Sequence, residues 1–90
     1  GRAAVELRAL ALSGPDAEAD AVAAALSSAL RPGDELVTVI LGRDAMPDVG
    51  ALAAEAVTRY GERALGDPDA IEVVIHAGGQ ARPDVLLALE

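Results

Sequence analysis

The sequence predicts a small α/β domain of two or three layers with the element order β-α-β-α-β-β. Strand-like segments alternate with amphipathic helical segments, and short loops rich in glycine and proline join them. This alternation implies a mostly parallel sheet with right-handed crossovers, and the short last loop implies an antiparallel C-terminal hairpin. We expect residues 1–90 to form a single domain.

The first strand is expected at residues 4–12, where apolar and polar side chains alternate in part. Residues 13–16 break this strand and open a helix. The helix is expected at 16–30, because its apolar side chains recur at helical spacing along one face. The sequence Arg-Pro-Gly-Asp at 31–34 ends the helix with a proline and a glycine.

The second strand is expected at residues 35–41, which are nearly all apolar or β-branched. Such a run is typical of a central strand that is buried on both faces. Pro47 fits the first position of the second helix, and Asp48 suits its positive N-terminal end. Either Gly61 or Gly66 ends this helix.

Residues 71–77 and 85–89 are the third and fourth strands. The loop between them contains Gly-Gly-Gln at 78–80 and is closed by Pro83. Two adjacent glycines permit positive φ angles or the close approach of another chain. We expect the Gln80 amide at the surface, where it can both donate and accept hydrogen bonds.

Composition excludes several classes of function. The chain has 15 acidic and 7 basic residues and a net charge of −8, which disfavours nucleic acid and anionic membranes as partners. It has no cysteine for a disulfide or a zinc-thiolate site, and no apolar run of the roughly 18 residues that a membrane span needs. We therefore expect a cytoplasmic protein. With Tyr60 as its only aromatic residue, the core is thin and favours support from a neighbouring domain or a homodimer.

The carboxyl ends of parallel strands meet at one edge of a sheet, where ligands and partners usually bind. The loops at 13–16, 42–44 and 77–83 should share this edge, and each contains glycine. We expect the partner-binding residues there: Gly42, Arg43, Asp44, His76, Gly78, Gly79, Gln80 and Arg82.

No residue is predicted to be catalytic or to bind a metal. His76 has no Cys, Asp or Glu at ligand spacing and is more typical of a half-buried strand residue. Helix capping explains Asp44 and Asp48 more simply than a pair of catalytic carboxylates does. The Gly-Gly-Gln tripeptide also occurs in peptide release factors, but those act on the ribosome through a basic chain and this chain is acidic. From the sequence, the Gly-Gly-Gln tripeptide can form either a plain turn or a docking loop.

Residues 35–44, residues 71–80 and the Leu-Leu-Ala-Leu-Glu sequence at 86–90 resemble one bacterial family. The family is the DAK-phosphatase or YloV-like proteins, which include the fatty acid kinase subunit FakA. The chain is similar to the extreme C-terminus of that family over about residues 34–90. One residue departs from the pattern, because Arg82 stands where family members often carry an aromatic residue.

The resemblance implies that the chain is the C-terminal lobe of a larger kinase-like protein. This lobe would be similar to DegV-type fatty-acid-binding proteins. The parent protein's N-terminal dihydroxyacetone-kinase-like domain would hold ATP and magnesium, and this lobe would hold no cofactor. The lobe would dock a fatty-acid-binding partner of the DegV/FakB type, whose fatty acid is then phosphorylated. A structural or self-association module and a phosphatase or hydrolase domain are the alternatives.

Overall fold

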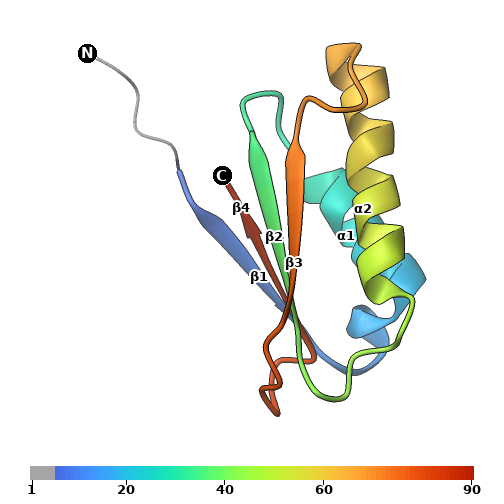
Figure 1. The fold of residues 1–90 in the computed structure, drawn as a ribbon, viewed down its shortest axis with the longest axis vertical. Coiled ribbons are helices and arrows are strands. Elements are labelled where there is room, and N and C mark those ends of the chain that lie inside the picture. Colours follow the sequence, from blue (N-terminus) through green and yellow to red (C-terminus); the bar gives the residue numbers. More distant parts are fainter. Residues whose placement is uncertain (1–5) are drawn as a thin grey trace.

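A computed structural model describes residues 6–90, so the first two residues of the predicted strand at 4–12 lie outside the described part. Four strands and two main helices follow one another in the predicted order, with a 3-10 turn, η1, and a π turn, η2, added (Figure 1). The elements are β1 (Arg8–Leu12), η1 (Gly14–Ala17), α1 (Ala19–Ala29), β2 (Leu36–Leu41), α2 (Val49–Tyr60), η2 (Gly61–Leu65), β3 (Glu72–Ala77) and β4 (Val85–Leu89).

The four strands form one mixed sheet in the order β1-β4-β2-β3. The central position expected for residues 35–41 is confirmed, because β2 lies between β4 and β3. The predicted C-terminal hairpin is wrong, since β3 and β4 are not neighbours. The mostly parallel sheet is wrong as well, because only the β2–β3 pair is parallel, while β4 is antiparallel to β1 and β2.

The side chains of the last two strands explain this arrangement. β4 is apolar throughout, so it gains most from a position between two other strands. β3 carries the exposed side chains of Glu72 and His76, which remain in water at the edge of the sheet. The free energy gained by burying the more apolar strand β4 between β1 and β2 therefore outweighs the preference of the short β3–β4 loop for a hairpin.

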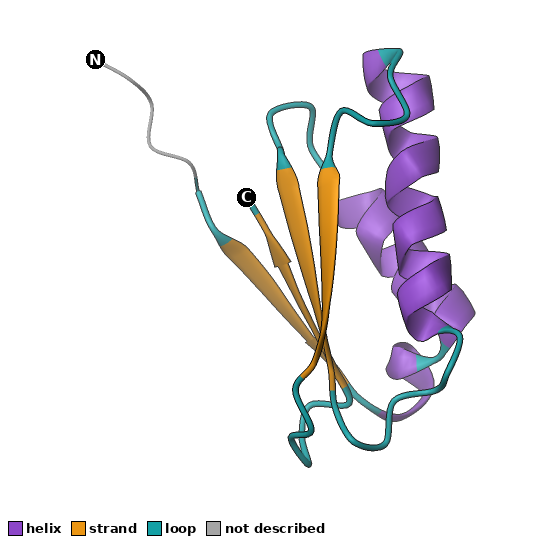
Figure 2. Ribbon diagram, viewed as in Figure 1, coloured by secondary structure: helices purple, strands orange, loops and turns teal. Residues whose placement is uncertain are grey.

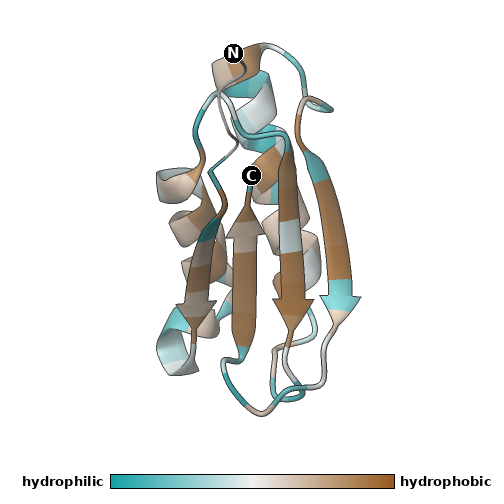
Figure 3. Cartoon of the chain, turned by 90° about the vertical axis from the view of Figure 1, so that its left-hand side faces the viewer, coloured by the Kyte–Doolittle hydropathy of each residue, from teal (hydrophilic) through white to brown (hydrophobic). Residues whose placement is uncertain are grey.

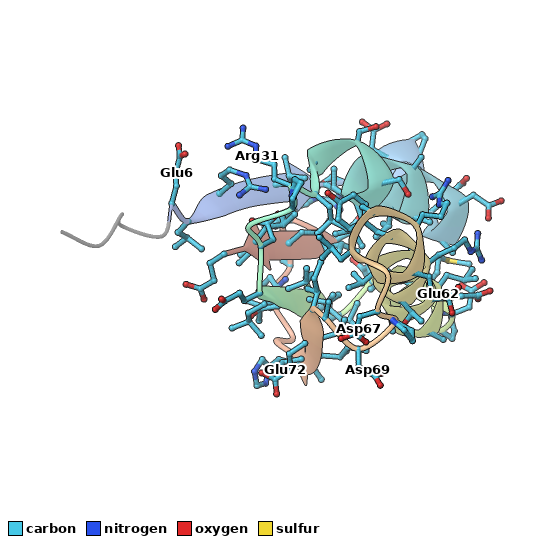
Figure 4. All side chains as sticks on the ribbon, turned by 90° about the horizontal axis from the view of Figure 1, so that it is seen from above. Glu6, Arg31, Glu62, Asp67, Asp69 and Glu72 are labelled. Carbon is cyan, nitrogen blue, oxygen red and sulfur yellow. The ribbon has the colours of Figure 1, made fainter. Side chains whose placement is uncertain are left out.

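Both helices lie on the same face of the sheet, so the domain has two layers (Figure 2). Alternate side chains of the two inner strands point into the space between the layers and are almost fully buried. Seen from above, side chains fill this space (Figure 4). The largest fully buried side chains are those of Val22, Leu26, Val37, Val39, Val49, Val57, Val85, Leu87 and Leu89.

The helix boundaries differ from the predicted ones in places. Helix α1 begins at Ala19 rather than at residue 16, because Glu18 is extended and separates it from η1. Helix α2 begins at Val49, two residues after Pro47. The helical segment continues beyond α2 as η2 and ends at Gly66, whose φ of +68° is accessible mainly to glycine.

A charged pair fastens the edge strand β1 to the loop before β2. The Arg8 guanidinium donates to both carboxylate oxygens of Asp34, at 2.8 Å each, and also to the Ala29 carbonyl at 2.8 Å. The backbone N–H of Arg31 donates to the same carboxylate. The hydrogen bond from Arg8 is the main cause that lowers the pKa of Asp34; burial opposes it, and the Arg31 N–H adds to it. The second ion pair nearby, Arg31–Glu6 at 3.6 Å, is exposed and contributes little (Figure 4).

We predict that Asp34→Asn lowers the free energy of unfolding at pH 7 by about 1–2 kcal/mol, because charge-assisted hydrogen bonds are lost. The pKa of Asp34 is lowered by folding, so its stabilisation is present above the unfolded value of about 3.9 and is lost as the pH falls through the folded value. Urea unfolding followed from pH 7 to pH 2 should therefore show a weaker acid dependence in the variant.

The control is Glu55→Gln, which alters an exposed ion pair between Glu55 and Arg59 on α2. This variant should change the unfolding free energy by less than about 0.5 kcal/mol. Equal changes of the unfolding free energy by the two substitutions would show that the Asp34 cluster stabilises the domain no more than an exposed ion pair does.

Candidate partner-binding edge

Three loops meet at one edge of the sheet, at the bottom of Figure 1. Because β4 runs antiparallel to both β1 and β2, those two strands point the same way, and β3 is parallel to β2. The carboxyl ends of β1, β2 and β3 therefore lie together. The loops that follow them, at 13–14, 42–44 and 78–84, form what we call the loop edge.

Asp84 joins the three loops. Its backbone carbonyl accepts a hydrogen bond from the Gly42 N–H at 2.7 Å, and its carboxylate accepts one from the Gly14 N–H at 2.9 Å. The second carboxylate oxygen accepts from the Arg82 guanidinium at 2.7 Å. The Gly14 N–H is the main cause that lowers the pKa of Asp84; partial burial opposes it, and Arg82 adds to it. Asp84 was not among the predicted site residues.

The Gly-Gly-Gln loop crosses the end of β2 on its way to β4. The N–H groups of Gly78 and Gly79 both donate to the Leu41 carbonyl, at 2.8 and 3.2 Å, and the Arg43 N–H donates to the Gln80 carbonyl at 3.0 Å. These bonds hold the loop tightly against the end of β2. Such a loop is already ordered before a partner arrives, which lowers the entropic cost of binding.

Two glycines of the loop edge are required for different reasons. Gly42 is buried, and a Cβ there would lie 2.8–2.9 Å from three carbonyl oxygens of the crossing loop. Gly79 has open space around it but a φ of +71°, which strains residues with a side chain. Gly42 thus serves the crossing of two chain segments, while Gly79 serves the turn itself.

Gln80 does not project into solvent as expected. Its side chain is half-buried, and its amide nitrogen donates to the Pro83 carbonyl at 3.1 Å. A Cβ on Gly78 would collide with this same amide and with Ile40. The amide therefore braces its own loop, and it is not free at the surface to meet a partner.

The remaining predicted residues lie in two places. Arg43, Asp44, Gly79 and Arg82 are exposed at the loop edge, where Arg82 is held by Asp84. His76 is exposed on β3, in register with Ile40 of β2, and so belongs to the face of the sheet opposite the helices. The loop edge as a whole offers exposed charge on a rigid backbone, which suits contact with another macromolecule.

A shallow pocket of about 230 Å³ lies between the N-terminal ends of α1 and α2. Its lining includes the acidic residues Glu18, Asp20 and Asp48, together with Met46. Negative charge repels phosphate, so this pocket does not suit a nucleotide. Within residues 6–90 there is no group of three or more His, Asp or Glu side chains placed to hold a metal ion, and no helix is long and apolar enough to cross a membrane.

Comparison with models of known protein families gives no match to this chain, and neither does comparison with curated protein sequences. The resemblance to the C-terminal domain of the FakA family therefore stays a prediction.

We predict that Gly42→Ala destabilises the domain by roughly 3 kcal/mol, because its Cβ meets backbone atoms that cannot move without breaking the loop edge. Gly33→Ala is the matched control: Gly33 is exposed, and a Cβ there meets nothing within 4 Å. Thermal and urea unfolding of both variants test this, and similar stabilities would mean that the crossing is looser than the structure indicates.

Proposed function

We propose that this domain is a non-catalytic docking module, the C-terminal lobe of a fatty-acid-kinase-like protein of the DAK family. Its partner is a fatty-acid-binding protein of the DegV/FakB type. In this proposal the parent protein's kinase domain, with ATP and magnesium, phosphorylates the fatty acid that the partner carries. The lobe supplies binding energy and position and takes no part in the chemistry.

The observation that carries the proposal is the rigid, exposed loop edge. Backbone hydrogen bonds and the Asp84 carboxylate fix three loops in one arrangement before any partner is present. Exposed loops on a rigid scaffold are where proteins most often place their binding residues. The resemblance adds the kind of partner, since residues 42–44 and 78–80 belong to the segments that resemble the FakA family.

Within the loop edge, Arg43 is the residue that we assign to partner contact. Its backbone N–H is held by the Gln80 carbonyl, while its side chain is exposed. An arginine placed on a fixed backbone loses little freedom when it forms a charge-assisted hydrogen bond with a carboxylate or an acyl phosphate. Arg82 is less suited to this contact, because the Asp84 carboxylate holds it at 2.7 Å.

We predict that Arg43→Ala weakens binding of the fatty-acid-loaded DegV/FakB-type partner by about 1–3 kcal/mol, which is roughly 5- to 150-fold. Arg63→Ala is the matched control, because Arg63 is an exposed arginine in η2, near the opposite end of the sheet. Isothermal titration of the partner with the wild type and both variants measures the effect. Equal affinities for all three would place the interface elsewhere, and absence of binding by the wild type would refute the proposed function.

A further inference from the structure

The face of the sheet opposite the helices carries no covering element among residues 6–90 (Figure 3). On the inner strands β2 and β4, the side chains of this open face are half-buried, whereas those on the helix side are buried apart from Leu41. Viewed face-on, the strands are hydrophobic over most of their length (Figure 3). A partly exposed apolar surface across the inner strands of a sheet is typical of an interface.

The strand register arranges the open face in three rows across the sheet. The middle row is small and uncharged and consists of Ala9, Ala88, Thr38 and Val74. The row nearer the loop edge is larger and consists of Ala11, Leu86, Ile40 and His76. The row at the opposite end consists of Glu90, Leu36 and Glu72, of which two are acidic.

We propose that a second copy of this chain covers the open face, giving a two-fold symmetric dimer in which the two sheets pack face to face. The loop edge stays free in this dimer, so the proposal concerns a second surface and does not depend on the docking function. Closed two-fold dimers are the commonest oligomers, and they require a surface that complements itself.

The pattern of rows is self-complementary. A two-fold axis can run across the strands along the middle row. The middle rows of the two copies then face each other, and each end row faces the opposite end row of the second copy. The small side chains of the middle row then let the sheets approach to the usual distance of about 10 Å. Leu36 lies over Ile40 of the second copy, so large apolar side chains meet beside the small ones.

The polar side chains at the two ends of β3 agree with the same axis. Because the axis lays β3 over β3 in the opposite direction, Glu72 faces His76 of the second copy. The alternative axis, parallel to the strands, would place the acidic row with Glu72 and Glu90 over its own copy. In a chain with a net charge of −8, gathering the acidic side chains of both copies at one end disfavours that second arrangement.

The area is sufficient for a small dimer. Four strands spaced about 4.8 Å apart, each about 17–20 Å long, give a flat footprint of about 350 Å² per copy. The accessible surface of side chains exceeds their footprint, so two copies bury on the order of 1,000 Å², the lower limit for a specific interface. A core without Trp or Phe also leaves a chain of this size in need of further buried area.

The test is the mass of the chain in solution, measured by sedimentation equilibrium and by light scattering after gel filtration. At about 100 μM the wild type should have twice the 9.0 kDa mass of one chain. Thr38→Arg places two like charges together on the two-fold axis and should weaken the dimer at least about tenfold. Ala9→Arg, on the exposed edge strand of the same row, should do the same if Thr38→Arg disturbs folding.

Thr58→Arg is the matched control, since it makes the same substitution at an exposed position of α2. It should stay dimeric, with the circular dichroism spectrum of the wild type. A monomeric wild type at this concentration overturns the proposal, as does equal weakening by the substitutions at 38 and 58. A wild type that is monomeric, and whose binding of the fatty-acid-binding partner is weakened by Thr38→Arg, would assign the face to that partner and also overturn it. Arg43→Ala should leave the dimer intact, which separates this test from that of the docking function.

Discussion

The passage of the chain beneath the end of β2 is the constraint on which the rest of the structure depends. To reach its place between β1 and β2, β4 must be preceded by a loop that crosses β2. Gly42 makes room for this crossing, and its N–H binds the Asp84 carbonyl at the point of contact. A side chain at residue 42 would press three carbonyl oxygens apart, so the position of the last strand depends on a hydrogen atom in place of a Cβ.

The position of β4 determines both faces of the sheet. On one face Val85, Leu87 and Leu89 reach the helices and complete the core. On the other face Leu86 and Ala88 join β1 to β2 in a continuous apolar surface. The strand that closes the core therefore also creates the surface that we assign to a second copy. The loop edge arises from the same crossing, because the segment that enters β4 carries the Gly-Gly-Gln turn and Asp84.

Local patterns in the sequence are sufficient to predict the elements but not the way in which they pair. Periodicity located all four strands and both helices within a few residues, because it reflects burial of one face at a time. Pairing depends on comparison between distant strands: β3 holds Glu72 and His76, whereas β4 has no charged residue within Val85–Leu89. That contrast was visible in the sequence and favours β4 at the centre. Loop length, a local signal, favoured the hairpin and was misleading.

The predicted site was located more accurately as a region than residue by residue. The three loops do meet, because strand direction alone determines which ends lie together. Gln80 was assigned to solvent because glutamine is usually exposed, and the proximity of the Pro83 carbonyl could not be foreseen without the loop conformation. Asp84 was missed, although an aspartate directly before an apolar strand is the signal that could have identified it.

The pairing of β1 with β4 also has a consequence for the order in which the domain is assembled during synthesis. Arg8 is in register with Leu89, so within residues 6–90 the edge strand β1 and its strand neighbour β4 come from opposite ends of the described segment. Contacts between such distant residues close slowly, because a long segment must first lose its freedom. On the ribosome β1 has to wait for Val85–Leu89 to emerge. Until then the β2–β3 pair and its helices form a partial sheet with an unfilled edge, which is the stage at which a nascent chain is open to chaperones and to pairing with the wrong strand.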